Sequence, residues 1–145
     1  MPSQNDVISD ATRLGLANFA ATSGAVPDSF KILLQHAPAA FAGYSLIRSD
    51  LMRDGALDLK TKELIFALLD TILGASEGAK VHAANAVRLG LPVPALAEGL
   101  VQCIMAAGIT TWNKAGRAAL EHAVAVRDQT ERDNNARVAA EPKRP

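Results

Sequence analysis

The sequence has 145 residues, enough for one domain that buries most of its surface in a single core. With 49% hydrophobic residues, it is typical of a globular protein and not of a disordered one. The 15 basic side chains are scattered and balance 15 acidic ones, which argues against nucleic acid or an anionic membrane as the main partner.

The expected location follows from the N-terminus, the apolar stretches and the cysteine content. The first ten residues contain neither a basic segment nor an apolar one, so no signal peptide is expected. The longest apolar stretches are interrupted by Asp70, Glu98 or Gln102 and are too short to span a bilayer. The single cysteine, Cys103, excludes an internal disulfide and fits a reducing compartment. We therefore expect a soluble, cytoplasmic protein.

A helical period of apolar residues recurs along almost the whole sequence, and no segment alternates as a strand would. Glycine and proline residues mark most of the boundaries between the helical segments. The expected helices cover about residues 9–22, 27–37, 38–53, 59–73, 77–89, 94–108 and 110–133. We therefore predict an all-α fold of about seven helices, with a single domain over residues 1–135 and a flexible tail over residues 136–145.

The two central helices have different patterns. Asp58 is a favourable N-cap for the first, and Gly74 is expected to end it in the left-handed conformation. Because this helix is apolar on nearly all sides, we expect it to lie in the middle of the fold. Ser76 is the expected cap of the next helix, whose buried stripe consists mainly of alanine. The stripe contains Ala79, Ala83, Ala86 and Val87, whereas the side chains expected to face away are Lys80, Asn85 and Arg88.

Two carboxylates on the first central helix are candidates for chemistry. Glu63 and Asp70 lie seven positions apart, on one face and roughly 10 Å apart along the helix axis. Asp70 is flanked by Leu68, Leu69 and Ile72, an environment in which a bare carboxylate is costly. We therefore expect it to face either a polar partner or a cavity. A structural role stays open for both, for Asp70 as a carboxylate bonded to a neighbouring helix terminus or an arginine.

His82 is the third candidate and falls on the border of the alanine stripe, beside Ala79 and Ala86. These small neighbours leave room for a partner side chain or a small ligand, although a structural histidine fits the same pattern. His36 lies at a helix end, where a cation interacts favourably with the helix dipole. His122 lies on the expected inner face of the last helix, where a core or interface role is more common than ligand binding.

The sequence has no pattern that points to a metal or to a reactive thiol. It contains no HExxH motif, no histidine pair at ligand spacing and no cysteine cluster, so no metal site is expected. Cys103 lies on an apolar helix and is expected to be a small core residue, not a nucleophile.

The chain between residues 56 and 120 carries a resemblance to a known superfamily. This segment reads ALDLKTKELIFALLDTILGASEGAKVHAANAVRLGLPVPALAEGLVQCIMAAGITTWNKAGRAAL. It resembles the carboxymuconolactone decarboxylase and alkyl hydroperoxidase D superfamily in its two successive helices ending in LG and the apolar helix that follows. The resemblance implies an alkyl hydroperoxidase D-like all-α fold and a homo-oligomer, a trimer or hexamer, with sites near subunit contacts. His122, Trp112 or Tyr44 from elsewhere in the assembly would then complete the pocket.

The redox branch of that superfamily has a glutamate 12 positions before a CxxC motif and a histidine four positions after the second cysteine. Glu63 and His82 fall on the glutamate and histidine positions, whereas Ala75 and Gly78 fall on the cysteine positions. A thiol peroxidase needs a nucleophilic and a resolving thiol, and Cys103 lies on another helix. Peroxidase activity is therefore disfavoured.

The decarboxylase branch lacks the cysteine pair and carries a stretch such as EGxxKxH, to which EGAKVH is similar but one residue shorter. The resemblance implies cofactor-free acid–base chemistry on a small carboxylated lactone or enol acid. His82 would act as general acid or base and Glu63 would orient it or relay a proton. Amides near Glu77 and Gly78 at the start of the second helix could bind the substrate carboxylate. The substrate-binding residues on this hypothesis are Glu77, Gly78, Lys80 and Asp70.

Two hypotheses of different classes therefore remain. The first is a lyase or isomerase that acts on a small carboxylated metabolite without a metal or redox cofactor. The second is a non-catalytic protein of the same fold, either a small-molecule-binding module or a structural oligomer, for which the loss of both thiols is the sequence support. A thiol peroxidase that uses Cys103 is a third and weaker alternative.

Overall fold

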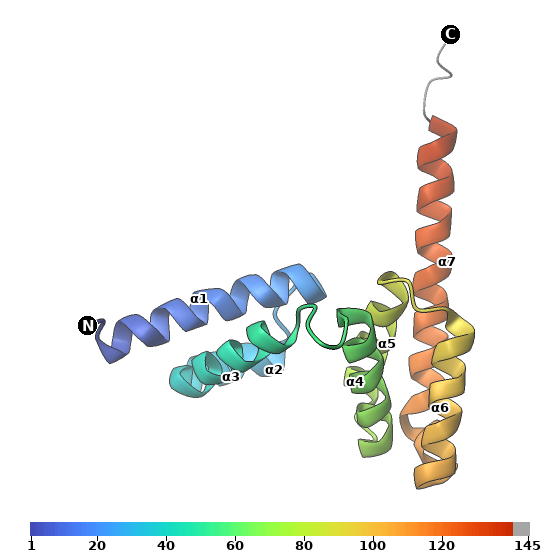
Figure 1. The fold of residues 1–145 in the computed structure, drawn as a ribbon, viewed down its shortest axis with the longest axis horizontal. Coiled ribbons are helices and arrows are strands. Elements are labelled where there is room, and N and C mark those ends of the chain that lie inside the picture. Colours follow the sequence, from blue (N-terminus) through green and yellow to red (C-terminus); the bar gives the residue numbers. More distant parts are fainter. Residues whose placement is uncertain (141–145) are drawn as a thin grey trace. The chain divides into compact units, whose positions relative to one another are not determined.

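The computed structural model describes residues 1–140, which are helical with no strand among them, as the sequence predicts (Figure 1). The helices are α1 (Gln4–Ser23), α2 (Asp28–His36), α3 (Pro38–Leu51), α4 (Leu59–Leu73), α5 (Ser76–Arg88), α6 (Val93–Ala107), the π-helix η1 (Trp112–Gly116) and α7 (Arg117–Ala140). The chain forms two compact units, one over Met1–Ala56 and one that begins at Leu57. The prediction of a single domain over residues 1–135 did not anticipate this division and stays a prediction.

The first unit consists of α1, α2 and α3. Helix α1 begins five residues earlier than predicted because Ser3 and Asp6 form a capping box. The Ser3 hydroxyl accepts a hydrogen bond from the Asp6 amide at 3.3 Å, and the Asp6 carboxylate accepts one from the Ser3 amide at 2.9 Å. At the other end Gly24 adopts a φ of 74°, so the helix ends where the sequence predicts.

An aromatic cluster joins the three helices of the first unit. The rings in contact are Phe19, Phe30, Phe41 and Tyr44. The guanidinium of Arg48 lies over the Phe19 ring, 4.5 Å from its centroid, and donates a hydrogen bond to the Thr22 hydroxyl at 2.9 Å. Tyr44 therefore serves the packing of this unit, although 38% of it is exposed.

The second unit begins with α4, whose two ends are as predicted. The Asp58 carboxylate accepts a hydrogen bond from the Thr61 amide at 2.7 Å, and Gly74 follows the helix with a φ of 72°. The predicted cap of α5 is wrong. Ser76 is the first residue of the helix, Ala75 occupies the N-cap position, and no side chain of the described residues caps this end.

The core of the second unit is rich in alanine. Its buried cluster comprises Ala67, Ala79, Ala83, Leu96, Leu100, Ala115, Ala119 and Ala123. Such small side chains allow α5 to approach α4 and α7 closely, which brings side chains at the α4–α5 contact within hydrogen-bonding distance.

Helix α4 contacts α5, α6 and η1 within the second unit, but one stripe of it stays exposed there. It buries the face that carries Glu63, Ala67 and Thr71. Its opposite face is open, with Leu69 50% exposed and Leu73 79% exposed. The all-round apolar pattern therefore reflects a face that packs against α5, α6 and η1 and a stripe that is exposed within the second unit.

The C-terminal helix also differs from its predicted bounds. A π-helix, η1, covers Trp112–Gly116, and α7 then continues to Ala140, seven residues beyond the predicted end at about Asp133. Polar pairs support this extension, such as Gln129 with Asp133 at 2.7 Å. Residues 136–140 of the predicted flexible tail are therefore helical, and residues 141–145 lie outside the described part of the chain.

Within residues 1–140, no helix combines the length and the apolar character needed to cross a membrane.

Candidate functional site

The centre of the candidate site is a buried glutamate–histidine pair at the contact of α4 with α5. Glu63 is 1% exposed, and its Oε2 lies 2.6 Å from Nδ1 of His82. Its other oxygen, Oε1, accepts a hydrogen bond from Nδ2 of Asn85 at 3.3 Å. Both carboxylate oxygens are thus bonded, which offsets the cost of burying the charge. Glu63 and His82, the two catalytic residues that the resemblance implies, are thus in contact, and their catalytic roles stay a prediction.

His82 is held in one orientation by two contacts. A carboxylate can only accept, so the Nδ1 atom of His82 carries the hydrogen that is donated to Glu63. The imidazole also stacks on the ring of Phe66, with 5.0 Å between centroids and 26° between planes. Nε2 has no hydrogen-bond partner within the described part of the chain, and 17% of the side chain is exposed. Nε2 is therefore the nitrogen available for proton exchange with a ligand.

Asn85 belongs to this site, although the helical projection of α5 predicts that it faces away from the core. It is 6% exposed and connects Glu63 to Arg88, whose Nη1 donates to Asn85 Oδ1 at 3.1 Å. The projection was wrong because it took the alanines as the whole buried face. The signal was present in the spacing: Asn85 follows His82 by three positions, and residues three apart on a helix share a face.

Asp70 lies two turns beyond Glu63 on α4 and contacts the start of α5. A Cβ atom built on Gly78 would lie only 2.2 Å from Oδ2 of Asp70, so the carboxyl group occupies that space. Burial raises the pKa of the Asp70 carboxyl above its usual value, and positive charge on His82 partly opposes this shift. The carboxyl makes no hydrogen bond with any described residue, so the structural role considered above, a bond to a helix terminus or an arginine, is not realised.

Glu77 and Lys80, the other two predicted binding residues, form an ion pair with each other. Nζ of Lys80 lies 2.5 Å from Oε1 of Glu77, whose side chain is 87% exposed. A substrate carboxylate that binds Lys80 therefore has to compete with Glu77 for the ammonium group. The structure thus brings Glu63, Asp70, Gly78 and His82 together and forms the Glu77–Lys80 pair on the first turns of α5.

We expect Asp70→Asn to raise the melting temperature at neutral pH. The pKa of Asp70 is raised in the folded state, so its protonated form contributes to the stability of the fold. This contribution is fully present below the unfolded pKa of about 3.8 and is lost as the pH rises through the folded pKa. Asparagine has no charge to desolvate, so the variant should gain most at neutral pH and least near pH 4. Thermal unfolding followed by circular dichroism across this range measures the difference. A lower melting temperature of the variant at neutral pH would contradict the expected sign.

The other candidates of the sequence analysis lie outside this site. Cys103 is buried with its sulfur 3.6 Å from the Leu68 carbonyl oxygen, and burial raises the pKa of its thiol, which disfavours the reactive thiolate. His122 is exposed, so its predicted place on the inner face of the last helix is wrong. Among residues 1–140, no three His, Cys, Asp or Glu side chains form a group able to hold a metal ion.

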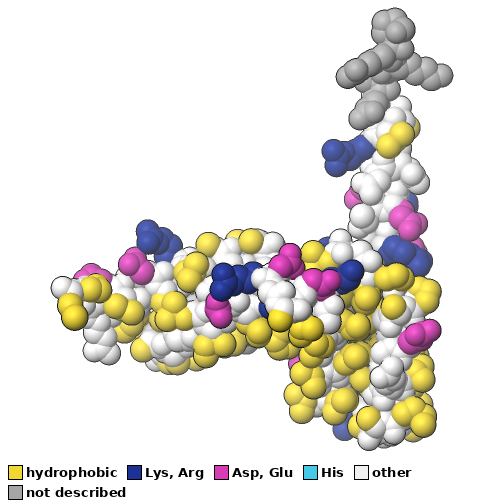
Figure 2. Space-filling model, in the orientation of Figure 1, with side chains coloured by type: hydrophobic (Ala, Val, Ile, Leu, Met, Phe, Trp, Pro, Cys, Tyr) yellow, Lys and Arg dark blue, Asp and Glu magenta, His cyan; other side chains and the backbone are white. Residues whose placement is uncertain are grey.

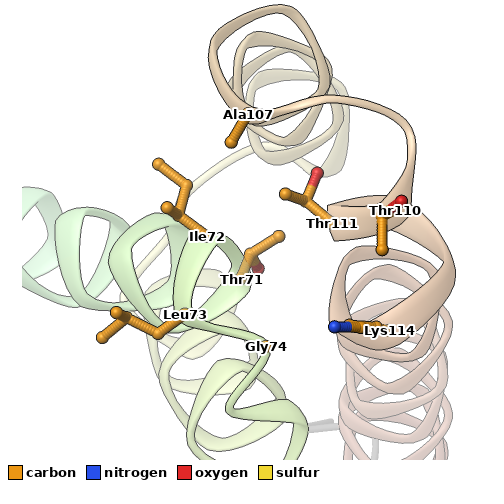
Figure 3. A pocket seen from close by; sticks show the side chains of 8 residues that line it. All are labelled: Thr71, Ile72, Leu73, Gly74, Ala107, Thr110, Thr111 and Lys114. Carbon is orange, nitrogen blue, oxygen red and sulfur yellow. The ribbon is translucent and has the colours of Figure 1, made fainter.

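A separate pocket of about 180 Å³ lies where the end of α4 meets the start of η1 (Figure 3). Its lining residues are Thr71, Ile72, Leu73, Gly74, Ala107, Thr110, Thr111 and Lys114. None of the site residues predicted from the sequence is among them. The hydroxyls of Thr71 and Thr111 are bonded to backbone carbonyls, so Thr110 and Lys114 supply the free polar groups of this pocket.

The fold and the site together define an all-helical protein with a thiol-free acid–base pair at a helix contact. A sequence profile of the carboxymuconolactone decarboxylase family matches residues 38–122, more than half of the chain. The chain belongs to the carboxymuconolactone decarboxylase family.

A solved structure supports the same conclusion. The chain is similar to a protein of Burkholderia xenovorans LB400 that is provisionally named a carboxymuconolactone decarboxylase. The two share 29% sequence identity with a TM-score of 0.80, over 87% of this chain and 98% of the other. A comparison with curated proteins finds no match.

Proposed function

We propose that the protein catalyses acid–base chemistry, decarboxylation or isomerisation, on a small carboxylated lactone or a related enol acid. The observation that carries the proposal is the 2.6 Å contact between Glu63 and a partly exposed His82, in a chain of the carboxymuconolactone decarboxylase family. No sulfur stands at positions 75 and 78, so the proposed chemistry proceeds by proton transfer and not by thiol exchange.

Decarboxylation of such a lactone requires the protein to stabilise the negative charge that develops on oxygen and to allow a proton to reach carbon. The bond between the ring carbon and its carboxylate breaks, CO2 leaves, and the electron pair moves to the lactone carbonyl oxygen through a conjugated double bond. One proton then adds to carbon, so each CO2 released is matched by one proton taken up. Nε2–H of a protonated His82 would donate a hydrogen bond to the developing negative charge on oxygen, and Glu63 would stabilise the imidazolium.

Asn85 supports this chemistry from behind Glu63. Its amide donates to Oε1 of Glu63 at 3.3 Å, which leaves Oε2 directed at His82. Glu63 and Asn85 would thus be positioning residues, and His82 would be the group that touches the substrate.

Binding of the substrate carboxylate is proposed at the first turn of α5, near Glu77, Gly78 and Lys80. Helix N-termini favour anions, and Lys80 adds a positive charge. The Asp70 carboxyl lies against Gly78, so a substrate anion would bind there more favourably when Asp70 is protonated. The raised pKa of Asp70 favours that neutral form.

The test is incubation of the purified full-length protein with a panel of carboxylated lactones, carboxymuconolactone first. Release of CO2 with matching formation of the decarboxylated lactone is the expected result, and isomerisation would appear as a new product without CO2. Absence of any product across the panel would contradict the proposal.

The alternative is a protein that binds a small molecule without changing it, or a purely structural oligomer. The ion pair between Lys80 and Glu77 favours this alternative, because it occupies the cation expected to bind a substrate. A thermal-shift screen with a metabolite library separates the cases: stabilisation by a ligand that is recovered unchanged indicates a binding module, and no stabilisation indicates a structural role. A thiol peroxidase is the least supported alternative, since Cys103 is buried.

We also propose that the protein is a homo-oligomer in the cytoplasm. The single cysteine is consistent with a reducing compartment. The support for an oligomer is a set of large apolar side chains on α4, on α6 and just beyond α6, which are 44% to 82% exposed and would be covered by a second copy of this chain; this set is called the apolar patch. The patch consists of Leu69, Ile72, Leu73, Val101, Met105 and Ile109. Figure 2 shows apolar side chains gathered on the surface of the unit that carries these helices.

We expect Leu73→Glu to shift the protein from an oligomer to the 15.2 kDa monomer, because a buried carboxylate without a partner is costly at an interface. Size-exclusion chromatography with light scattering measures the mass. Gln35→Glu adds the same charge at an exposed position of α2 and serves as the control. A wild-type protein that is monomeric at all concentrations tested would contradict this part of the proposal.

A further inference from the structure

Asp70 of α4 contacts Gly78 in the first turn of α5. A Cβ atom at position 78 would lie 2.2 Å from Oδ2 of Asp70, 2.9 Å from its Cγ and 3.5 Å from its Oδ1. All three heavy atoms of the carboxyl group thus lie within 3.5 Å of the position that Cβ of a larger residue 78 would take. A glycine at this position is what allows the Asp70 carboxyl to be there.

This contact lies next to His82. Gly78 and His82 are four positions apart on α5 and therefore share a face of the helix. Glu63, Phe66 and Asp70 are likewise spaced along one face of α4, where Glu63 bonds Nδ1 of His82 and Phe66 stacks on its ring. Of the two carboxyl groups on this face, that of Glu63 is bonded to His82, whereas that of Asp70 has no hydrogen bond to the described residues and is influenced by the charge of His82.

We propose that Asp70 is a second catalytic group of this site, which delivers a proton to the substrate carbon after CO2 has left. The inference rests on the proposed function and assigns the two proton-handling tasks to two residues. His82, with Nε2–H, would bind the carbonyl oxygen. Asp70, as a neutral carboxylic acid, gives up its proton to carbon, becomes a carboxylate and regains a proton from solvent before the next turnover.

The environment of Asp70 suits this task. Burial favours its neutral form, so an acid with a transferable proton is present closer to neutral pH than an exposed aspartate allows. Positive charge on His82 stabilises the carboxylate that forms when the proton is given up. The ionisable groups on the helices packed against α4 are Glu77, Lys80, His82, Arg88, Glu98, Cys103 and Lys114, and His82 is the one whose charge acts on Asp70.

A purely structural Asp70 has different consequences. If its carboxylate served only to stabilise the start of α5, its removal would lower stability and leave the chemistry of bound substrate unchanged. If it is the proton donor, its removal slows turnover and does not lower stability.

Two variants remove the acid in independent ways. Asp70→Asn keeps the shape but has no acidic proton. Gly78→Ala keeps Asp70 but places a Cβ where its carboxyl lies, so the side chain must rotate away; alanine is also the better helix former by about 1 kcal/mol, so folding should not suffer. Gly43→Ala, on α3, is the matched control, because a Cβ there meets nothing within 4 Å.

The experiment measures kcat and KM with carboxymuconolactone against pH for each variant. Asp70→Asn and Gly78→Ala should each lower kcat by about 10²- to 10⁴-fold, remove one limb of the pH profile and lose no more kcat when combined. KM is expected to change as well, because both residues border the proposed binding site of the substrate anion. Gly43→Ala should equal the wild type. Wild-type turnover that persists in both variants would overturn the role of Asp70 and leave the proposed function intact. Absence of wild-type turnover would overturn both. In a ligand-free check, carbon NMR of the Asp70 carboxyl should show its pKa rising in His82→Gln; an unchanged titration would refute the coupling.

Discussion

Replacing His82 by glutamine is expected to lower kcat for decarboxylation by about 10²- to 10⁴-fold, the usual contribution of a general acid or base. Glutamine retains an amide N–H that can donate to the buried Glu63 carboxylate, so the fold should survive the substitution. It cannot carry the positive charge with which a protonated His82 would stabilise the negative charge that develops on the substrate oxygen. Steady-state kinetics with the lactone, together with circular dichroism to confirm folding, measure the effect.

The control for this variant is His36→Gln, which changes an exposed histidine in the last turn of α2. Its activity should match the wild type. A His82→Gln protein that turns over the lactone at the wild-type rate would show that the histidine has only a structural role in the pair with Glu63.

The second large effect is expected on stability. Glu63→Ala should lower the free energy of unfolding by about 1–3 kcal/mol for each buried donor that it leaves unsatisfied. The substitution leaves Nδ1 of His82 and Nδ2 of Asn85 without their acceptor and opens a cavity in a position that is 1% exposed. Urea unfolding measures the loss. Glu63→Gln, which keeps the shape and one acceptor, should cost less stability but still reduce activity.

Glu98→Ala is the matched control, because Glu98 is an exposed glutamate in the middle of α6. Its effect should stay within about 0.5 kcal/mol of zero, as for most surface substitutions. Equal and small effects of Glu63→Ala and Glu98→Ala would mean that the buried pair contributes nothing to folding. Such a result would also remove the reason to treat Glu63 as the residue that holds His82.

The sequence predicts the parts of the fold that depend on local chemistry. Asp58 and Gly74 define α4 to the residue, since capping and a left-handed glycine are decided within one turn of chain. The predicted cap at Ser76 is wrong by one residue: serine is the favoured capping residue, but Ala75 occupies the N-cap position and makes no side-chain hydrogen bond there. The π-helical turn at Trp112 has no local sequence signal, so the last helix was predicted as continuous from Thr110.

The site was predictable where spacing along one helix or a family pattern located it. Both criteria single out Glu63 and His82, which are in contact in the structure, and their catalytic roles stay a prediction. Asn85 was missed because the projection counted only apolar side chains as buried, although its bond to Glu63 crosses between helices. The contact of Asp70 with Gly78 was not foreseeable, because it depends on how closely α4 and α5 approach, and that distance is set by alanines elsewhere in the contact.

The exposed face of α4 shows a further limit of prediction from the sequence. An apolar helix is expected to be covered, but the sequence does not say whether its own chain or a second copy covers it. Leu69 and Leu73 are open in the single chain, so the pattern is explained by one surface for folding and another for assembly.

The most direct measurement of the central claim is the initial rate of CO2 release from carboxymuconolactone by the wild type and by His82→Gln, side by side at equal folded concentration. An acid–base site built on the Glu63–His82 pair predicts steady release by the wild type and a rate that is lower by a factor of about 10² or more in the variant. No release by the wild type, or equal release by both proteins, would contradict it.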